Sequence, residues 1–276
     1  MSNSNHRVAA AQMATGLNVS ANLLEAERLI REAADTGAGL VVLPENFAFM
    51  GKRDQDVLTL REQDGEGPLQ SFLSQVAARY GVWLVGGTIP LVARGAGRVR
   101  AASLVFNERG ERVARYDKIH LFDVKVPGGD ERYIESSTIE PGDDIIVLDS
   151  PFGRLGVAVC YDLRFPEMFR QMLDSGMELL AIPAAFTAIT GKAHWETLVR
   201  ARAIENLCYV IAAAQGGYHI NGRETHGHSM IVDPWGTVLG QVPRGNGSIC
   251  APLDMDFQTS VRRNFPTIEH RRLKCR

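Results

Sequence analysis

The chain has 276 residues, of which 45% are hydrophobic and 22% charged, and its 30 Lys and Arg against 32 Asp and Glu leave a formal charge of −2. This balance excludes a strongly basic nucleic-acid-binding domain and an intrinsically disordered chain. No uncharged apolar run reaches the roughly 18 residues that a membrane-spanning helix needs. The N-terminal residues lack the basic and apolar regions of a secretory signal, so we expect a cytoplasmic protein.

The cysteines give no sign of a disulfide framework or a zinc site. Cys160, Cys208, Cys250 and Cys275 lie far apart and form no C-x-x-C pair. We therefore expect free thiols, no metal and no cofactor. The length suits one domain over residues 1–276, with a core over about 7–255 and a tail over 256–276 that packs on the core or lies at a subunit interface.

Apolar periodicity predicts a mixed α/β protein. In the first half, strands are expected at 7–13, 40–43 and 82–87, and helices at 18–35 and 68–80, with Asn18 as a helix cap. Residues 99–106 and 112–116 flank a turn at 107–110 and predict an antiparallel hairpin. The second half predicts strands at 145–148, 154–159, 179–182, 209–214, 229–232, 237–241 and 248–253, and helices at 166–175 and 191–207.

A cysteine follows the predicted strand 154–159 and precedes a helix. In open α/β folds, such a turn presents its side chain at the carboxyl end of the sheet, where ligands bind. The following backbone N–H groups point at the same place, so a thiol there is suited to act as a nucleophile beside an oxyanion hole. Cys160 is therefore a candidate nucleophile. The alternative for this segment is a small buried side chain that only packs.

Two further predicted strands end in charged residues. Strand 40–43 leads through Pro44 to Glu45, and strand 112–116 leads through Asp117 to Lys118. Taken singly, each is typical of a solvated charge at a strand end. Together they match a catalytic thiol, because a carboxylate can take the thiol proton and return it to a leaving amine. An ammonium group can stabilise the thiolate and then the oxyanion.

Three segments around these residues resemble the signatures of the nitrilase superfamily of carbon–nitrogen hydrolases. They are Leu43-Pro44-Glu45-Asn46-Phe47, Tyr116–Asp123 and Val159–Glu167, in the family's order and spacing. Later segments at 185–196, 200–206 and 227–236 resemble the Nit branch of amidases in particular. The likeness extends from about Val8 to Arg272. It implies a four-layer αββα sandwich that assembles into homodimers or higher homo-oligomers.

The same resemblance implies roles for the reactive residues. Glu45 is the general base, Lys118 the cation that stabilises the oxyanion, and Cys160 the nucleophile, with the backbone N–H of Tyr161 completing the oxyanion hole. The reaction expected is amide hydrolysis through a thioester acyl-enzyme, with release of an amine or ammonia. Replacing Cys160 or Lys118 by alanine should abolish turnover, and we expect the Lys118 variant to keep its fold.

The family often has a second glutamate between the lysine and cysteine segments. Glu135 is the best match for it, and Glu131 and Glu140 remain alternatives. That carboxylate would orient Lys118 and the substrate nitrogen. The competing interpretation is an acid that is simply solvated in a loop.

Within the Nit branch, the likeness favours hydrolysis of deaminated glutathione, with ω-amidase activity on 2-oxo-dicarboxylate monoamides as the alternative. Activity on N-carbamoyl compounds or nitriles remains open. Both favoured substrates carry a carboxylate, which a guanidinium binds bidentately. Arg164 and Arg202 are candidates for that contact, with a structural ion pair as the alternative for each. By family position, Phe186 and Thr187 line the pocket.

A Cys–His hydrolase is a rival enzyme class. In that case Cys160 would pair with His120 or His228, but Glu45 and Lys118 would be left without a role. The non-enzymatic alternative is a binding protein that keeps the fold and has lost turnover.

Histidines also raise the question of a metal site. His219, His226 and His228 lie close in sequence, but no metal-binding motif accompanies them, so structural histidines are favoured. The basic residues near the C-terminus are interrupted by acidic ones, which argues against binding of nucleic acid.

Overall fold

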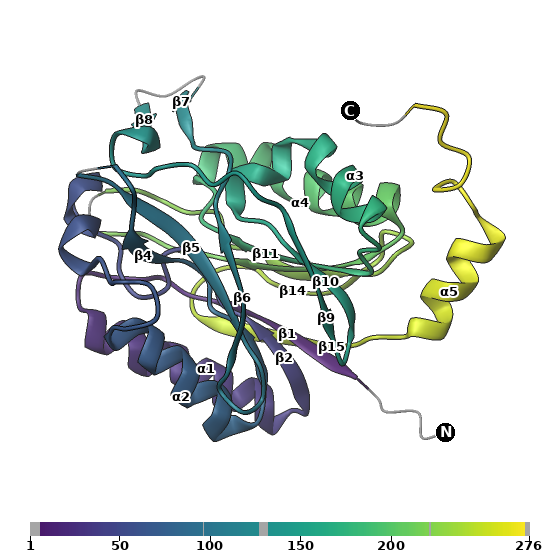
Figure 1. Cartoon of the computed structure of the whole chain (residues 1–276), viewed down its shortest axis with the longest axis horizontal. Coiled ribbons are helices and arrows are strands. Elements are labelled where there is room, and N and C mark those ends of the chain that lie inside the picture. The colour runs from purple at the N-terminus through teal and green to yellow at the C-terminus, as the bar shows by residue number, and fades with distance from the viewer. Residues whose placement is uncertain (1–5, 96, 127–131, 221, 274–276) are drawn as a thin grey trace.

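Two mixed β-sheets form the centre of the molecule (Figure 1). The computed structural model describes residues 6–95, 97–126, 132–220 and 222–273. The strands of the first sheet are β1 (Arg7–Gln12), β2 (Ala38–Val42), β3 (Trp83–Val85), β4 (Ile89–Val92), β5 (Val99–Phe106), β6 (Arg112–Asp117) and β15 (Gly247–Pro252). Those of the second sheet are β9 (Ile146–Ser150), β10 (Gly153–Val157), β11 (Leu179–Ala184), β12 (Tyr209–Ala214), β13 (Ser229–Val232) and β14 (Val238–Val242).

Parallel strands lie in the middle of both sheets. The first sheet has the order β15-β1-β2-β3-β5-β4, with β6 paired to β5, and the second has the order β14-β13-β12-β11-β10-β9. β1, β2 and β3 pair in parallel, as do β10, β11 and β12. Their carboxyl ends therefore carry loops at one end of each sheet, where open α/β folds bind ligands.

Helices cover the outer face of each sheet. They are α1 (Val19–Asp35), α2 (Pro68–Tyr80), α3 (Pro166–Asp174) and α4 (Ala188–Asn206), while α5 (Met255–Asn264) lies beside the residues that lead into β11 and β12. Along β1, Val8 and Ala10 belong to the core between the sheets, whereas Ala9 and Ala11 pack against α1 and α2. α3 and α4 cover the second sheet, which completes four layers in the order α, β, β, α (Figure 1).

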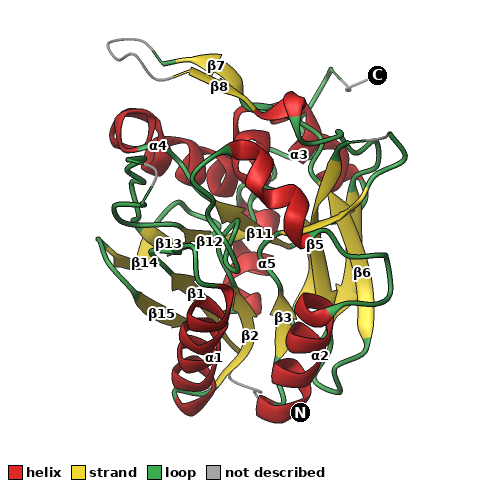
Figure 2. Cartoon of the chain, turned by 90° about the vertical axis from the view of Figure 1, so that its left-hand side faces the viewer, coloured by secondary structure: helices red, strands yellow, loops and turns green. Residues whose placement is uncertain are grey.

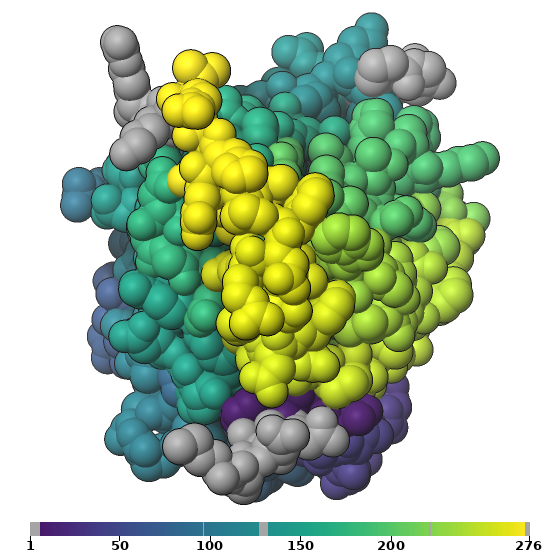
Figure 3. Space-filling model, turned by 90° about the vertical axis from the view of Figure 1, so that its right-hand side faces the viewer, coloured from purple at the N-terminus to yellow at the C-terminus, as the bar shows by residue number. Residues whose placement is uncertain are grey.

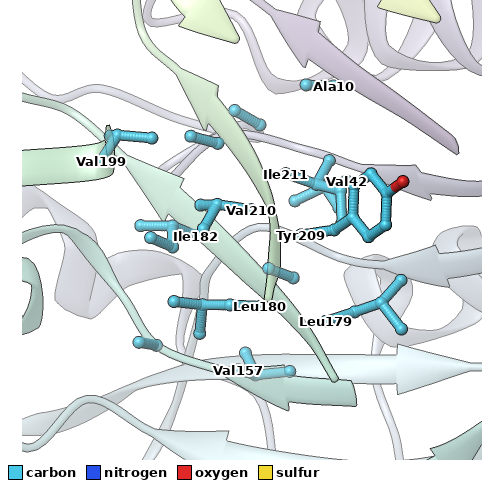
Figure 4. Close-up of a cluster of buried hydrophobic side chains, with 14 of the residues drawn as sticks. Ala10, Val42, Val157, Leu179, Leu180, Ile182, Val199, Tyr209, Val210 and Ile211 are labelled. Atoms are coloured by element: carbon cyan, nitrogen blue, oxygen red, sulfur yellow. The ribbon is translucent and has the colours of Figure 1, made fainter. Parts of the chain in front are cut away.

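The core between the sheets contains aliphatic side chains from both. Figure 4 shows Ala10 and Val42 of the first sheet beside Ile211 of β12, while Val210, the preceding residue, lies on the side of Val199 from α4. All five side chains are fully buried. Because strand residues alternate between faces, β12 must be apolar on both, as its sequence Tyr-Val-Ile-Ala-Ala-Ala is.

Local signals in the sequence predicted several boundaries. Asn18 caps α1 by accepting a hydrogen bond from the Ala21 N–H at 3.1 Å, as expected. The predicted hairpin of β5 and β6 is confirmed, with a 3.0 Å bond from the Asn107 N–H to the Glu111 carbonyl at its turn.

The helix expected from residue 191 begins earlier. Thr187 caps α4 by accepting a hydrogen bond from the Thr190 N–H at 3.3 Å, so the helix starts at Ala188. The strand expected at 154–159 ends at Val157, and Cys160 begins a short 3₁₀ helix, η3 (Cys160–Arg164).

Some elements had no signal in the sequence. They are β4, the small pair β7 (Asp123–Lys125) and β8 (Arg132–Ile134), the 3₁₀ helices η1 (Asp54–Leu60) and η2 (Glu135–Ser137), and α5. β7 and β8 are three residues each, too short for a periodic pattern. β4 contains Pro90 and lies at the edge of its sheet, where proline is tolerated.

The C-terminal segment packs against the residues that lead into β11 and β12 of the second sheet. α5 buries Gln258 and Val261, and the Gln258 amide donates to the carbonyl oxygens of Glu178 and Leu207 at 2.8 and 3.0 Å. Figure 3 shows this segment, in yellow, lying across one face of the molecule. In the ranges that the structure describes, none of the helices has the length and apolar character that a bilayer crossing requires.

Candidate active site

Four reactive or polar groups meet where strands of the two sheets end. Glu45 and Lys118 follow β2 and β6 of the first sheet, and Cys160 and Ala185 follow β10 and β11 of the second. All four line the same pocket. Figure 2 views the molecule from this end, where β7 and β8 project above the sheets.

Lys118 lies between two carboxylates. Its Nζ donates to Glu45 Oε1 at 2.8 Å and to both oxygens of Glu135 at 2.8 and 2.9 Å, and its side chain is only 1% exposed. Burial alone would lower the pKa of Lys118, but the charges of Glu135 and Glu45 outweigh burial and hold it well above its ordinary value. The ammonium is therefore charged at any physiological pH.

Glu135 is fixed by more than the lysine. Its Oε2 also accepts a hydrogen bond from the Phe122 N–H at 2.6 Å. Burial raises the pKa of Glu135, and the charge of Lys118 opposes that rise. The competing candidate Glu140 lies elsewhere, bound to Arg100 at 2.7 Å, and Glu131 falls outside the described residues.

The thiol lies in a sharp turn. Cys160 has a left-handed backbone with a φ of 50°, which non-glycine residues seldom adopt, and its Sγ accepts a hydrogen bond from the Ala185 N–H at 3.5 Å. Burial and the negative charge of Glu45 raise the pKa of Cys160 above its ordinary value, although Lys118 acts in the opposite direction. The resting thiol is thus protonated, and a base is needed to make it nucleophilic.

A buried polar network holds the turn that carries Glu45. The Gln215 amide donates to the Glu45 carbonyl oxygen at 2.9 Å and to Thr15 Oγ1 at 2.7 Å. His219 in turn places Nδ1 2.9 Å from the Thr15 carbonyl oxygen and Nε2 2.8 Å from Thr225 Oγ1. His219 is therefore a structural residue with both ring nitrogens engaged.

The pocket encloses about 960 Å³ of empty space, part of which is open solvent at its mouth. Tyr161, Arg164, Phe186 and Thr187 all line it. The Arg164 guanidinium carbon lies 5.0 Å from the Phe186 ring centre, and its Nη1 lies 3.1 Å from His194 Nδ1. Among the residues that the structure describes, no acidic side chain pairs with Arg164, whose guanidinium lines the pocket.

Arg202 does not reach the pocket, which contradicts the prediction that it binds substrate. Its Nε and Nη2 donate to the Leu163 carbonyl oxygen at 3.0 and 2.8 Å, and its Nη1 pairs with Glu205 at 2.7 Å. The residue is 5% exposed, on the face of α4 that packs toward η3 and α3. It supports the turn after Cys160 as a structural ion pair.

The histidines proposed as alternatives are occupied elsewhere. His120 Nδ1 lies 2.7 Å from Asp162 Oδ1, and its ring stacks on Phe165 at 3.7 Å. His226 and His228 stack on each other at 4.3 Å, and neither lines the pocket. Over the ranges described, no three His, Cys, Asp or Glu side chains are grouped so that they could hold a metal ion.

Part of the pocket wall was not foreseen. Arg223, Thr190 and residues at or just before η1, among them Phe49, Met50 and Val57, also line it. Arg223 donates from Nη2 to the Ala185 carbonyl oxygen at 2.7 Å and lies over the Tyr133 ring at 5.1 Å. These residues come from loops, and nothing in their sequence pattern marked them.

A buried thiol beside a carboxylate–ammonium–carboxylate cluster, in the lining of one pocket, defines a hydrolase that uses cysteine to attack an electrophilic carbon. The family model described as carbon-nitrogen hydrolase matches residues 7–263. The deaminated glutathione amidase of Yersinia enterocolitica is 42% identical over 269 residues, covering 97% of this chain and 93% of that protein.

Solved structures agree. Saccharomyces cerevisiae Nit3, a member of branch 10 of the nitrilase superfamily, has a TM-score of 0.86 at 31% identity and covers 97% of both chains. A mutant of the Nesterenkonia sp. AN1 amidase, solved after Michael addition of acrylamide at its active-site cysteine, has a TM-score of 0.75 at 26% identity, covering 95% of this chain and 98% of that one.

This chain therefore belongs to the carbon–nitrogen hydrolase family. Family and site together make it a thiol-dependent amidase. The resemblance to the nitrilase superfamily and its Nit branch, and the α/β fold that it implied, are confirmed.

Proposed function

We propose that this amidase hydrolyses a small amide that carries a carboxylate, with deaminated glutathione as the favoured substrate. The observation that carries the proposal is the cluster in which Lys118 binds Glu45 and Glu135 at 2.8 Å, in one pocket with Cys160 and Arg164. The cluster supplies a base, a cation and a nucleophile, and Arg164 supplies a charge for the substrate carboxylate.

Acylation begins with proton transfer. Glu45 takes the proton from Cys160, and the thiolate attacks the amide carbonyl carbon. The negative charge moves to the carbonyl oxygen, which Lys118 and the Tyr161 N–H stabilise. As the tetrahedral intermediate collapses, Glu45 returns the proton to the leaving nitrogen, and an amine or ammonia departs from a thioester on Cys160.

Deacylation uses the same groups. Glu45 removes a proton from water, the resulting hydroxide attacks the thioester carbonyl, and the proton passes to the departing sulfur of Cys160. Glu135 holds Lys118 in place through both steps, since it accepts two of the lysine's hydrogen bonds. The raised pKa of Cys160 suits this cycle, because the thiolate that departs from the thioester readily takes up a proton.

The choice of substrate is supported by relatives and by the pocket. The Yersinia enterocolitica relative is a deaminated glutathione amidase. The Arg164 guanidinium, which has no acidic partner among the described residues, suits a carboxylate, and both this substrate and the ω-amides of 2-oxo acids possess one. ω-Amidase activity therefore remains the second candidate function.

The test compares kcat/KM for deaminated glutathione, 2-oxoglutaramate, a simple nitrile and an N-carbamoyl amino acid. We expect the first to be preferred and Cys160→Ala to remove all turnover. A higher kcat/KM for 2-oxoglutaramate would reassign the protein as an ω-amidase. No hydrolysis of any of the four would refute the substrate proposal.

We also propose that the chain acts as a cytoplasmic homodimer or higher homo-oligomer, as the family resemblance implies. Light scattering coupled to gel filtration tests the assembly, and a mass of about 30.3 kDa, that of one chain, would contradict it. Fractionation of cells that express the natural gene tests the location.

A further inference from the structure

Asp162 is a fully buried carboxylate that the mechanism does not use. It lies two residues after the nucleophile, yet its oxygens point to the segment that carries Lys118 as well as to its own turn. Oδ2 accepts from the Tyr116 hydroxyl at 2.6 Å and from the Val159 N–H at 2.8 Å. Oδ1 accepts from the His120 N–H at 3.0 Å and lies 2.7 Å from His120 Nδ1.

These contacts lie next to both Lys118 and Cys160 in the chain. Tyr116 and His120 stand two positions before and two positions after Lys118, so the carboxylate binds the chain on either side of the lysine. Val159 precedes Cys160, so the same carboxylate also fixes the start of the nucleophile turn. One side chain thus joins the end of β6 and the residues after it, in the first sheet, to the segment following β10, in the second.

The contacts extend toward the pocket wall. The Tyr116 hydroxyl also accepts a hydrogen bond from the Ile119 N–H at 3.2 Å, which tightens the turn after Lys118. The His120 ring stacks on Phe165, and Phe165 meets the Tyr161 ring edge-on at 5.3 Å. Displacing Asp162 would therefore disturb the lysine, the thiol and one wall together.

We propose that Asp162 is a positioning residue, which sets the relative placement of Lys118 and Cys160 through Tyr116, His120 and Val159. The inference builds on the proposed function, since it concerns the same reactive groups. It differs from a purely structural role because the carboxylate links the segments that carry the two groups, and reactions of bound groups are sensitive to misplacement of about 1 Å.

Asp162→Asn tests the proposal. An amide has a single acceptor oxygen, so whichever way it is turned, one pair of donors meets its NH2 group. We expect kcat to fall by at least about tenfold while KM stays within about threefold, since the pocket residues outside η3, such as Phe186 and Thr187, are retained. The rate of alkylation of Cys160 by iodoacetamide should change with kcat, after subtraction of the labelling seen in Cys160→Ala.

Glu62→Gln is the matched control. Glu62 is also a buried carboxylate, 6% exposed, and accepts hydrogen bonds from Leu69 N–H, Gln70 N–H and the Gln70 amide, but it does not line the pocket. Its variant should lose stability without losing kcat or thiol reactivity. Tyr116→Phe, which removes one of the four contacts, should give a smaller loss of kcat and serves if Asp162→Asn does not fold.

The outcomes separate the alternatives. If Asp162→Asn, or Tyr116→Phe in its place, keeps the wild-type kcat and alkylation rate, or if Glu62→Gln loses both to the same extent, the positioning role is wrong. If the wild-type protein hydrolyses none of the four substrates, the proposed function fails. The rates at which Cys160 is alkylated in the wild type, in Asp162→Asn and in Glu62→Gln then still decide the role of Asp162.

Discussion

At the scale of single residues, the raised pKa of Cys160 makes the base indispensable. Glu45→Gln should lower amide turnover by at least about 100-fold, because the proton acceptor is lost. The same change removes a negative charge that raises the thiol pKa, so alkylation of Cys160 should reach its half-maximal rate at a lower pH than in the wild type. Alkylation rates measured against pH check this, and a midpoint that is unchanged or higher would contradict it.

The geometry changes the expectation for Lys118. Alanine at this position was expected to leave the fold intact, but Lys118 holds two carboxylates at 2.8 Å in a buried site. Removing it leaves Glu45 and Glu135 close together without their cation, which typically costs about 3–5 kcal/mol. Lys118→Met should therefore lower the free energy of unfolding in urea as well as abolish turnover.

Neutralising both acids provides the control for that experiment. Adding Glu45→Gln and Glu135→Gln to the Lys118→Met chain removes the unpaired charges, so most of the lost stability should return while activity stays absent. A Lys118→Met protein as stable as the wild type would show that the cluster contributes nothing to folding.

Replacing Arg164 should affect kcat/KM differently for substrates with and without a carboxylate. A lost hydrogen bond to a charged group is worth about 1.5–3 kcal/mol, so Arg164→Gln should reduce kcat/KM for a carboxylate-bearing amide by roughly 10- to 100-fold. An aliphatic amide of similar size without a carboxylate should be hydrolysed at an unchanged rate. Equal losses for both amides would mean that Arg164 serves the pocket structure and not the carboxylate.

At the scale of elements, the turn after β3 supports the end of β2. Gly87 has a φ of 55°, and a Cβ on it would lie 2.2 Å from the carbonyl oxygen of Pro44, the residue before Glu45. Gly87→Ala should thus displace the turn that carries the base and reduce both stability and turnover. Gly81→Ala is the matched control, because Gly81 has a φ of 61° and a Cβ on it would meet no atom within 4 Å.

Both glycines have a left-handed backbone, and only a Cβ on Gly87 would meet a close steric contact. A left-handed backbone costs a residue with a Cβ about 1–2 kcal/mol, so both should lose about this much stability. Only Gly87→Ala should lose more, and only it should lose kcat. Thermal unfolding and steady-state kinetics measure the difference, and equal behaviour of the two variants would count against the contact with Pro44.

Elements with a regular period were predictable, and those defined by distant contacts were not. α1 and α2 show apolar helical spacing, and β12 is an unbroken apolar run. α5 is mostly polar and is held by Gln258, whose partners lie 80 and 51 residues away. No pattern within 255–264 could show that these carbonyl groups need a donor.

The residues of the site also fall into those that a local pattern predicts and those that depend on distant contacts. Glu45, Lys118 and Cys160 stand at strand ends, where a local pattern predicts exposure to a common edge. Arg202 was wrongly placed in the pocket, because helical spacing does not tell which face of α4 meets α3. Arg223 and η1 were missed, since their position depends on how loops from several elements come together.

At the scale of the whole molecule, the free energy of unfolding should depend on pH because of the titration of His226. Burial, and then the charge of His228, lower the pKa of His226 to about 4. Between about 6.5 and about 4, the unfolded chain binds a proton that the folded chain does not, so the free energy of unfolding falls as the pH falls. His226→Asn should reduce this slope by at most about 1.4 kcal/mol per pH unit, and by less where solvent screens the half-buried ring.

Urea denaturation at several pH values between 7 and 4 measures that slope. Identical slopes for wild type and His226→Asn would contradict the assignment.

The division of the reactive groups between two sheets has a consequence for folding. Glu45 and Lys118 follow strands of one sheet, and Cys160 follows a strand of the other. A partly folded chain in which either sheet has formed alone holds only a fraction of the catalytic groups, and a chain with undocked sheets is inert toward its substrate. Recovery of hydrolysis after dilution from denaturant therefore reports the docking of the two halves, whereas circular dichroism also responds to each half by itself.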